Sequence, residues 1–397
     1  MAKRRAIITG SSGQNGSYLG DFLLDKNYEV HGLTSDRVAL LTGGSGQDGS
    51  YLLEALVGKG YRTHSVQRRT ASRDMPEVET NPITKDKVVY HTANLSDSSS
   101  IARVIYEVQP DEIYNLAAQS DVGMSFDCPE ETADVSGVGV LRILEAVRTL
   151  GLGDRVRFYQ ASTSELFGGT QEKSKRESSP FYPRSPYAVA KLFGYWITVN
   201  YREAYGFHAS NGLLFNHESP RRGKNFVTRK VTIGAAQIFL GNQACLFLGN
   251  LDAKRDWGHA RDYVEAQWLI LQHETPGDYV IATGIQHSVR EFVSLAFDRL
   301  GISLIWQGSG VDETGIVEKV STSAEDCRVS VGDTVVRVDP SFYRPADVND
   351  LLGDASLAKE TLGWAPKTSF SELVREMVDA DLESARQQVR QQKLLGS

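Results

Sequence analysis

The chain has 397 residues, 41% of them hydrophobic and 23% charged, a balance typical of soluble globular proteins. Its length predicts about two or three domains, and its formal net charge of −7 argues against a nucleic-acid-binding protein. Cys128, Cys245 and Cys327 show neither metal-ligand nor disulfide spacing, and no segment approaches the ~18 apolar residues of a membrane helix. We therefore expect a cytoplasmic protein with neither a metal site nor a membrane partner.

A repeat opens the chain. Residues 8–33 and 41–66 align without gaps at an offset of 33, and 13 of those 26 positions are identical. Each copy is predicted to form a strand, a Gly-x-x-Gly-x-x-Gly turn, an amphipathic helix and a second strand. Such a turn needs glycine because the chain bends tightly and its backbone must approach a pyrophosphate at the helix N-terminus. Alone the pattern is weak, but its place between a strand and a helix favours a dinucleotide-binding turn.

Only one copy can open a parallel sheet. The predicted strands 29–33 and 38–42 are separated by four residues, whereas adjacent parallel strands need a crossover of about a dozen residues or more. We predict that the second copy is the working one, because it is continuous with the rest of the chain. It also ends in Gln67-Arg68-Arg69, whose basic side chains would suit a 2′-phosphate. Residues 1–37 are predicted to be a partial duplication, packed on an edge or poorly ordered.

Beyond the repeat, strand and helix patterns alternate. We predict strands at Val88–His91, Glu112–Ala117, Val156–Ala161 and Ser210–Phe215, and helices at Ser98–Glu107, Gly137–Leu150, Tyr187–Tyr205 and, in the tail, Ser369 to about Gln392. This alternation predicts an α/β fold, a Rossmann-like doubly wound parallel sheet with helices on both faces. We expect this domain to span residues 38–215. A smaller α/β substrate-binding lobe is expected at 216–397, with about 258–285 returning to the first domain.

Two segments supply candidate catalytic groups. Thr163 and Glu165 follow a predicted buried strand at its carboxyl end, where ligands bind in open α/β sheets. Tyr187 and Lys191 lie one turn apart on a helix whose start Pro186 marks. The lysine charge would favour tyrosinate and make Tyr187 a base. On spacing alone, the tyrosine and lysine could equally be a surface pair and Glu165 a helix cap.

Several long stretches carry a family resemblance. They are Thr42–Leu52, Phe158–Gly168, Pro180–Lys191, Leu214–Gly223, Phe226–Lys230, Arg255–Ala260 and Tyr343–Ala346. Over roughly residues 38–385 the chain resembles the extended short-chain dehydrogenase/reductase family (NAD-dependent epimerases and dehydratases), and within it the enzymes that dehydrate GDP-sugars. Relatives acting on deoxythymidine-diphosphate glucose usually carry Thr-Asp-Glu where this chain has Thr163-Ser164-Glu165.

The resemblance implies NADP as cofactor, GDP-mannose as substrate and a homodimer or homotetramer. The implied cofactor-binding residues are Gly43, Gly44, Ser45, Gly46, Gln47 and Asp48 around the pyrophosphate, Arg68 and Arg69 near the 2′-phosphate, Asn94 and Leu95 at the adenine, Leu116, Ala117, Ala118, Gln119 and Ser120 along the ribose and nicotinamide, and Tyr187, Lys191, His217 and Arg222. The implied substrate-binding residues are Ser125, Asn216, Lys230, Arg255 and Arg344. Cationic side chains suit a diphosphate because their N–H groups match its oxygens.

The resemblance also implies a hydro-lyase reaction. Tyr187 would take the C4 hydroxyl proton as hydride leaves C4, with Thr163 hydrogen-bonded to the same oxygen and Lys191 holding the nicotinamide ribose. Glu165 would remove the C5 proton and return it to the departing C6 hydroxyl. Hydride return to C6 would give GDP-4-keto-6-deoxymannose. Two alternatives stay open: a sugar-nucleotide 4-epimerase or 4-reductase, which needs no such carboxylate, and a non-catalytic dinucleotide-binding module.

Four positions depart from the usual family pattern. Asn94 stands where Asp is usual, Asp121 where His is frequent, Glu131 where Tyr is frequent, and Asp347 where Glu is usual. None of them belongs to the four candidate catalytic residues. If these departures have an effect, we expect it on cofactor preference or substrate affinity and not on the chemical step.

Overall fold

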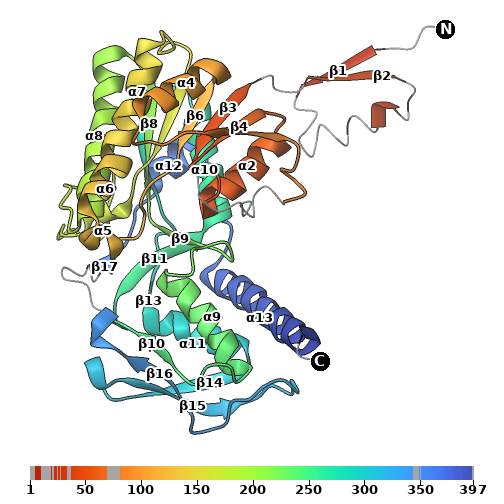
Figure 1. Cartoon of the computed structure of the whole chain (residues 1–397), viewed down its shortest axis with the longest axis vertical. Helices are drawn as coiled ribbons and strands as arrows, with labels where there is room; N and C mark the ends of the chain where they lie inside the picture. Colours follow the sequence, from red (N-terminus) through yellow and green to blue (C-terminus); the bar gives the residue numbers. More distant parts are fainter. Residues whose placement is uncertain are drawn as a thin grey trace.

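A seven-stranded parallel sheet forms the larger of two lobes (Figure 1). The computed structural model describes residues 37–68, 81–342, 348 and 350–395, together with 5–9, 19, 22–24, 26 and 28–33 near the start of the chain. In spatial order the strands are β12 (Asp278–Ile281), β8 (His208–Leu214), β7 (Arg157–Ala161), β6 (Glu112–Asn115), β3 (Val38–Thr42), β4 (Arg62–Gln67) and β5 (Val88–Thr92). In this sheet the chain begins with the central strand β3 and continues through β4 to the edge strand β5. It then crosses back to β6, on the other side of β3, and continues through β7 and β8 to the opposite edge strand β12. The switch point therefore lies between β3 and β6.

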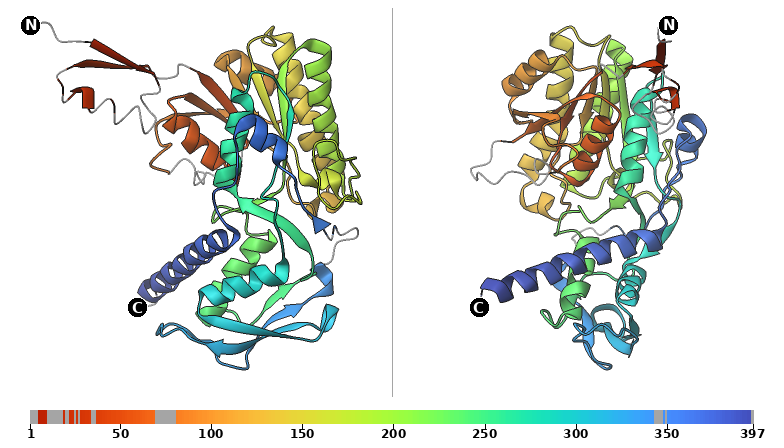
Figure 2. Two further views of the ribbon diagram at one scale, coloured as in Figure 1. Left: turned by 180° about the vertical axis from the view of Figure 1, so that it is seen from behind. Right: turned by 90° about the vertical axis from the view of Figure 1, so that its right-hand side faces the viewer.

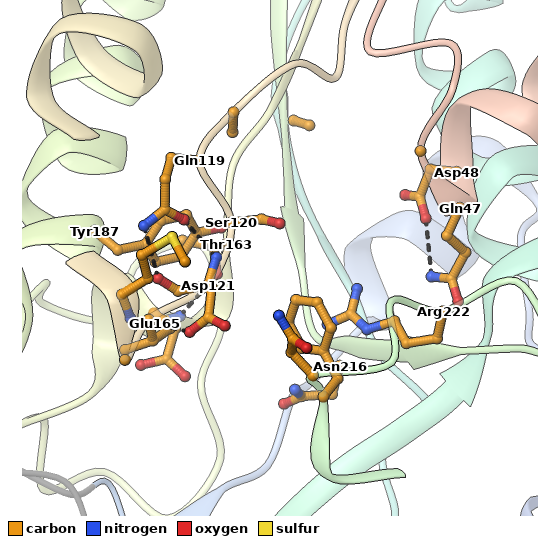
Figure 3. A pocket seen from close by; sticks show the side chains of 18 of the residues that line it. Gln47, Asp48, Gln119, Ser120, Asp121, Thr163, Glu165, Tyr187, Asn216 and Arg222 are labelled. Carbon is orange, nitrogen blue, oxygen red and sulfur yellow. Dashed lines mark hydrogen bonds between the residues drawn. The ribbon is translucent and has the colours of Figure 1, made fainter. Parts of the chain in front are cut away.

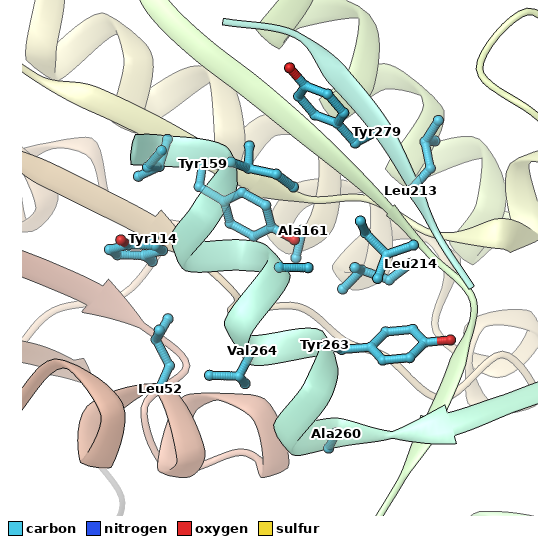
Figure 4. Close-up of a cluster of buried hydrophobic side chains, with 14 of the residues drawn as sticks. Leu52, Tyr114, Tyr159, Ala161, Leu213, Leu214, Ala260, Tyr263, Val264 and Tyr279 are labelled. Atoms are coloured by element: carbon cyan, nitrogen blue, oxygen red, sulfur yellow. The ribbon is translucent and has the colours of Figure 1, made fainter. Parts of the chain in front are cut away.

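Helices cover both faces of this sheet (Figures 1 and 2). One face carries α4 (Ser98–Val108), α7 (Gly139–Thr149) and α8 (Pro186–Tyr205), and the other carries α2 (Gln47–Gly58) and α10 (Ala260–Gln272), with α12 (Ser356–Leu362) beside β12. Every residue of β3 is buried, as expected for a parallel strand packed between two helical layers. On the α10 side, Leu52, Tyr114, Tyr159 and Val264 belong to one apolar cluster (Figure 4). The predicted doubly wound α/β fold is confirmed.

The smaller lobe is built around a second sheet. Its strands are, in order, β10 (Leu246–Leu248), β16 (Thr334–Val338), β15 (Thr314–Val320) and β14 (Ile302–Gln307), and its helices are α9 (Val227–Phe239), α11 (Val289–Arg299) and α13 (Phe370–Leu395). These elements enclose their own apolar core. A buried ion pair fixes α13 to α9, since Arg229 Nη2 lies 2.8 Å from Asp381 Oδ1.

A short pairing joins the lobes. β9 (Asn216–Glu218), which closely follows β8, pairs in parallel with β11 (Lys254–His259), and β11 also pairs with β13 (Gln286–Ser288) and β17 (Asp350–Leu351). Residues 258–285, predicted to return to the first domain, contribute α10 and β12. The large sheet and the smaller lobe are thus held together by backbone hydrogen bonds as well as by side chains.

The two copies of the repeat have different surroundings. β1 (Arg5–Thr9) and β2 (Glu29–Leu33) pair only with each other in the described chain, whereas the second copy supplies β3, α2 and β4 of the large sheet. The turn glycines of the first copy, Gly10, Gly13 and Gly16, lie outside the described residues. Figure 1 shows the β1–β2 pair standing apart from the body of the protein. Arg37 anchors the junction, with its Nη1 3.0 Å from Glu112 Oε1.

Across the described residues, no helix combines the length and apolar character that crossing a bilayer requires.

Candidate active site

A cavity of about 980 Å³ opens at the carboxyl ends of the central strands, between the two lobes (Figure 3). The larger lobe contributes the glycine turn and the segments that follow β4 to β8. The smaller lobe contributes the start of α9, part of β11 and the segment after β10. Doubly wound sheets bind their ligands at this position, outside the strand ends at the switch point.

The glycine turn leaves room for a phosphate. Gly43 has a φ of 75°, and a Cβ at Gly49 would lie 2.2 Å from the Gly43 carbonyl oxygen, so both positions require glycine. α2 begins after Gly46 without a side-chain cap. Gly46 itself lines the cavity. An uncapped helix N-terminus at a cavity is a favourable place for a pyrophosphate, so the residues present fit a dinucleotide.

A buried polar ladder crosses the ends of three strands and reaches α8. Thr42 Oγ1 donates to Asn115 Oδ1 at 2.6 Å, and Asn115 Nδ2 donates to Gln160 Oε1 at 2.7 Å. Both Gln160 Nε2 and Lys191 Nζ then donate to the Ala161 carbonyl, each at 2.8 Å. The ladder satisfies groups that would otherwise be buried without partners, and it fixes the direction of the Lys191 side chain.

Local capping places the other candidate groups. Ser185 caps α8 by accepting from Ala188 N at 3.1 Å, so Tyr187 falls in the first turn of the helix. Thr163 Oγ1 accepts from Glu165 N at 3.2 Å and starts a short 3-10 helix over Ser164–Phe167. Thr163, Glu165 and Tyr187 consequently share one wall of the cavity (Figure 3), and each is at least nine-tenths buried.

Burial dominates the acidity of the tyrosine and the lysine. It raises the pKa of Tyr187 to about 12; the hydrogen-bonded Thr163 side chain opposes this rise and the Glu165 charge adds to it. Burial likewise lowers the pKa of Lys191 to about 8. The Lys191 ammonium lies 5.9 Å from the centre of the Tyr187 ring. The prediction that the Lys191 charge makes Tyr187 a base therefore has to overcome burial, which disfavours the phenolate, and it stays a prediction.

A second polar cluster lies across the cavity. His217 Nε2 lies 2.9 Å from Asp48 Oδ2, Gln267 Nε2 donates to the same oxygen at 2.8 Å, and Gln47 Nε2 donates to the His217 carbonyl at 2.9 Å. Although burial opposes both charges, the Asp48–His217 pair lowers the pKa of Asp48 and raises that of His217. The glycine turn is thereby tied to β9 and α10.

Cations and aromatic rings line the side of the smaller lobe. The Arg222 guanidinium lies 3.7 Å from the Phe226 ring centre, and the Lys230 ammonium lies 3.3 Å from that of Phe342. Burial lowers the pKa of Lys230. Sequence reasoning missed both phenylalanines, although Phe226 begins one of the family-type stretches. Arg255, 9% exposed, also lines this side.

Most of the predicted site residues come together here. Those that line the cavity are Gly43, Ser45, Gly46, Gln47, Asp48, Arg68, Asn94, Leu95, Leu116, Ala117, Ala118, Gln119, Ser120, Thr163, Glu165, Tyr187, Lys191, Asn216, His217, Arg222, Lys230 and Arg255. Asp121 and Glu131, two of the departures, line it as well.

Two predicted residues do not line the cavity. Gly44 packs against β4, where a Cβ would lie 2.2 Å from Ser65 Oγ. Ser125 is fully buried and donates its hydroxyl to the Val122 carbonyl at 2.7 Å, so its side chain holds a turn and does not line the cavity. Arg69 and Arg344 lie outside the described residues. Within the described part of the chain, no group of His, Cys, Asp or Glu is arranged to hold a metal ion.

The sheet and the residues at its switch point define an enzyme of the extended short-chain dehydrogenase/reductase class. The solved structure of UDP-glucose 4-epimerase from Thermus thermophilus, in complex with NAD, is similar with a TM-score of 0.68 and 25% identity, over 87% of this chain and 98% of that one.

Sequence comparison narrows the class. A family model described as GDP-mannose 4,6 dehydratase matches residues 40–377. A GDP-mannose 4,6-dehydratase of Vibrio cholerae is 54% identical over 97% of this chain and 95% of its own length. The human GDP-mannose 4,6 dehydratase is 53% identical over 97% of this chain and 94% of its own length. The chain belongs to the GDP-mannose 4,6-dehydratase family, a family of hydro-lyases, and the predicted resemblance is confirmed.

Proposed function

We propose that the chain removes water from GDP-mannose in an NADP-dependent reaction that yields GDP-4-keto-6-deoxymannose. The family supports the substrate and the reaction. The observation that carries the chemistry is the shared wall of Thr163, Glu165 and Tyr187 in one cavity. A 4-epimerase or 4-reductase would need the hydroxyl and the phenol but not the buried Glu165 carboxylate.

The glycine turn and Lys191 are the proposed anchors of the cofactor. The related epimerase structure contains NAD, which supports a nicotinamide dinucleotide. The preference for NADP rests on Arg68, an exposed cation just after β4 that lines the cavity, because a guanidinium suits a 2′-phosphate. When bound, the oxidised cofactor supplies a hydride acceptor and a positive charge.

Each wall residue has one task in this proposal. A positive charge beside a buried phenol favours the phenolate, so Tyr187 accepts the proton of the C4 hydroxyl. Thr163 donates a hydrogen bond to the same oxygen. The resulting 4-keto group acidifies the C5 hydrogen, which Glu165 removes and then delivers to the C6 hydroxyl as it leaves as water. C5 must then regain one proton as C6 is reduced, and the proton that Tyr187 took from the C4 hydroxyl balances this step.

The smaller lobe is proposed to hold the GDP portion. Lys230 and Arg255 are cations on the cavity side of this lobe, and Asn216 lines the same cavity. Residues 38–215 would then bind the cofactor and 216–397 the substrate. Arg69 and Arg344 remain proposed ligands of the 2′-phosphate and of GDP-mannose.

A homodimer or homotetramer is part of the proposal. Val189, Phe193 and Trp196 form a stripe on α8 at 56%, 44% and 55% exposure. Their spacing places them on one helical face, and such a patch suits a second copy of the chain. Trp196→Glu should convert the oligomer into a monomer in light scattering.

The function is tested by incubating the protein with GDP-mannose and NADP. We expect a product lighter by one water, with no net formation of NADPH. An isomer of unchanged mass would indicate a 4-epimerase, stoichiometric redox change of the cofactor would indicate a dehydrogenase or reductase, and unchanged GDP-mannose would indicate a binding module.

A further inference from the structure

A second carboxylate faces the catalytic end of the cavity. Asp121 lies in the loop after β6 and lines the cavity on the same wall as Glu165 and Tyr187 (Figure 3). The chemistry proposed above assigns it no task.

The Asp121 backbone is held by one side chain. Gln119 Oε1 accepts from Asp121 N at 2.6 Å, and Gln119 Nε2 donates to the Asp121 carbonyl at 3.0 Å. The same amide nitrogen lies 3.4 Å from Thr132 Oγ1, and Gln119 N donates to Ser136 Oγ at 3.1 Å. A side chain that brackets both backbone groups of a loop residue restricts where that residue can point. The loop therefore presents the Asp121 carboxylate in a fixed position.

The carboxylate keeps one oxygen for a ligand. Asp121 Oδ1 accepts from Met124 N at 3.1 Å, which starts the short helix Met124–Asp127. Within the described part of the chain, no donor is hydrogen-bonded to Oδ2. An ionised carboxylate only accepts hydrogen bonds, so a ligand group facing it must be a donor.

The charges around the cavity indicate which end of the substrate supplies the hydrogen-bond donor that faces Asp121. A diphosphate would be repelled by Asp121 and Glu165, whereas Lys230 and Arg255 offer it cations on the smaller-lobe side of the cavity. The hydroxyl groups of a hexose are neutral donors. The charge asymmetry of the cavity thus favours an orientation with the sugar toward Asp121 and the phosphates toward the cations.

We infer that Asp121 is a specificity-determining residue that accepts a hydrogen bond from a hexose hydroxyl, with Gln119 as its positioning residue. This inference rests on the proposed sugar-nucleotide substrate. A hydrogen bond to a charged acceptor contributes about tenfold to a hundredfold in affinity. GDP has no hexose, so its binding should not depend on Asp121.

The test compares GDP-mannose with GDP. Dissociation constants are measured by calorimetry for the wild type, Asp121→Ala, Asp121→Asn and the control Asp154→Asn, with NADPH present because the reduced cofactor cannot accept a hydride from the sugar. Asp154 is exposed in a distant turn and does not line the cavity. We expect Asp121→Ala to weaken GDP-mannose about tenfold to a hundredfold, Asp121→Asn to weaken it less, and GDP to bind all four proteins equally. Gln119→Met should reproduce the selective loss.

Two results would overturn the inference. Equal losses for GDP-mannose and GDP would mean that Asp121 supports the loop or the nucleotide site, and unchanged affinity for both would mean that it meets no hydroxyl. The proposed function is judged separately, by wild-type turnover. A wild type that binds GDP-mannose without releasing water would refute the dehydratase and would leave the affinity ratio as the test of Asp121.

Discussion

The His217 imidazole and the Asp48 carboxylate form a mostly buried ion pair, 13% and 15% exposed, with Nε2 2.9 Å from Oδ2. The pair joins the first turn of α2 to β9, and Gln267 on α10 donates to the same carboxylate. Three elements that surround the proposed pyrophosphate site are therefore held by one carboxylate. The first copy of the repeat has Asn15 at the equivalent position, so it carries no charge with which to form such a pair.

Asp48→Asn should weaken both the fold and the cofactor site. Removing one partner leaves the mostly buried His217 without its counter-charge, a change that costs up to about 3 kcal/mol. We expect a lower free energy of unfolding in urea and a higher dissociation constant for NADP. Asp312→Asn, at an exposed position of the smaller lobe, is the matched control. Unchanged stability and NADP affinity in Asp48→Asn would show that the pair does not hold the turn.

The same pair predicts a pH dependence of stability. Burial disfavours charged His217, but the Asp48 carboxylate raises the folded-state pKa of His217 above its ordinary 6.5. The stabilisation is therefore complete below 6.5 and is lost as pH rises through the raised pKa. The Asp48 pKa is lowered from 3.8, so its contribution holds above 3.8 and is lost as pH falls through the lowered value.

Urea unfolding of the wild type and His217→Gln over a pH series measures this effect. The difference in unfolding free energy should be largest near pH 6 and should shrink toward alkaline pH. A difference that stays constant between about pH 6 and 9 would contradict the assigned ion pair.

Lys191→Met should separate stability from activity. Burial lowers the pKa of Lys191 to about 8, so a desolvated ammonium at this position destabilises the folded protein at neutral pH. Methionine removes that cost, and we expect unfolding to require about 1–3 kcal/mol more. Turnover should fall at least about 10²-fold, because Tyr187 loses a neighbouring charge. Lys173→Met, at an exposed position, should change neither quantity. A variant that keeps full turnover would remove Lys191 from the proposed mechanism.

Glu165→Gln should stall water loss while C4 oxidation continues. The amide keeps the size of the side chain but cannot take up the C5 proton, and general acid–base catalysis by one group contributes ~10²–10⁴-fold. Single-turnover mass spectrometry should therefore show much slower loss of water, while hydride transfer from C4 remains detectable by NADPH absorbance. Water loss at the wild-type rate would exclude Glu165 from this step.

Deleting residues 1–36 should leave cofactor binding unchanged. The shortened chain keeps Arg37 and its contact with Glu112, together with the whole second copy of the repeat. Fluorescence titration with NADPH measures the binding. Loss of binding would show that the first copy contributes to the dinucleotide site.

The repeating patterns of the sequence predicted the sheet but not the contacts across it. Strand and helix alternation is local, so β3, α2 and α8 could be anticipated from neighbouring residues. The Asp48–Gln267 hydrogen bond joins residues 219 positions apart, and the stacking of Lys230 on Phe342 likewise depends on tertiary packing. No local pattern encodes either contact.

Motif position also did not fix side-chain direction. Ser125 lies near the cavity, yet its hydroxyl turns back to the Val122 carbonyl. Tyr187 and Lys191 fall where the motif predicted, but the spacing alone could not show how strongly burial shifts the pKa of each group. Desolvation depends on the whole surrounding fold, so acidity was the least predictable property of the site.

GDP-mannose labelled with deuterium at C4 provides the most direct test of the central claim. The claim is that one hexose, bound between Tyr187 and Glu165, is oxidised at C4 and reduced at C6. After conversion by the wild-type protein, NMR and mass spectrometry locate the label. We expect a product that has lost one water and carries the C4 deuterium at C6. A product whose C6 methyl group carries no deuterium, or a substrate recovered with its label in place, would contradict it.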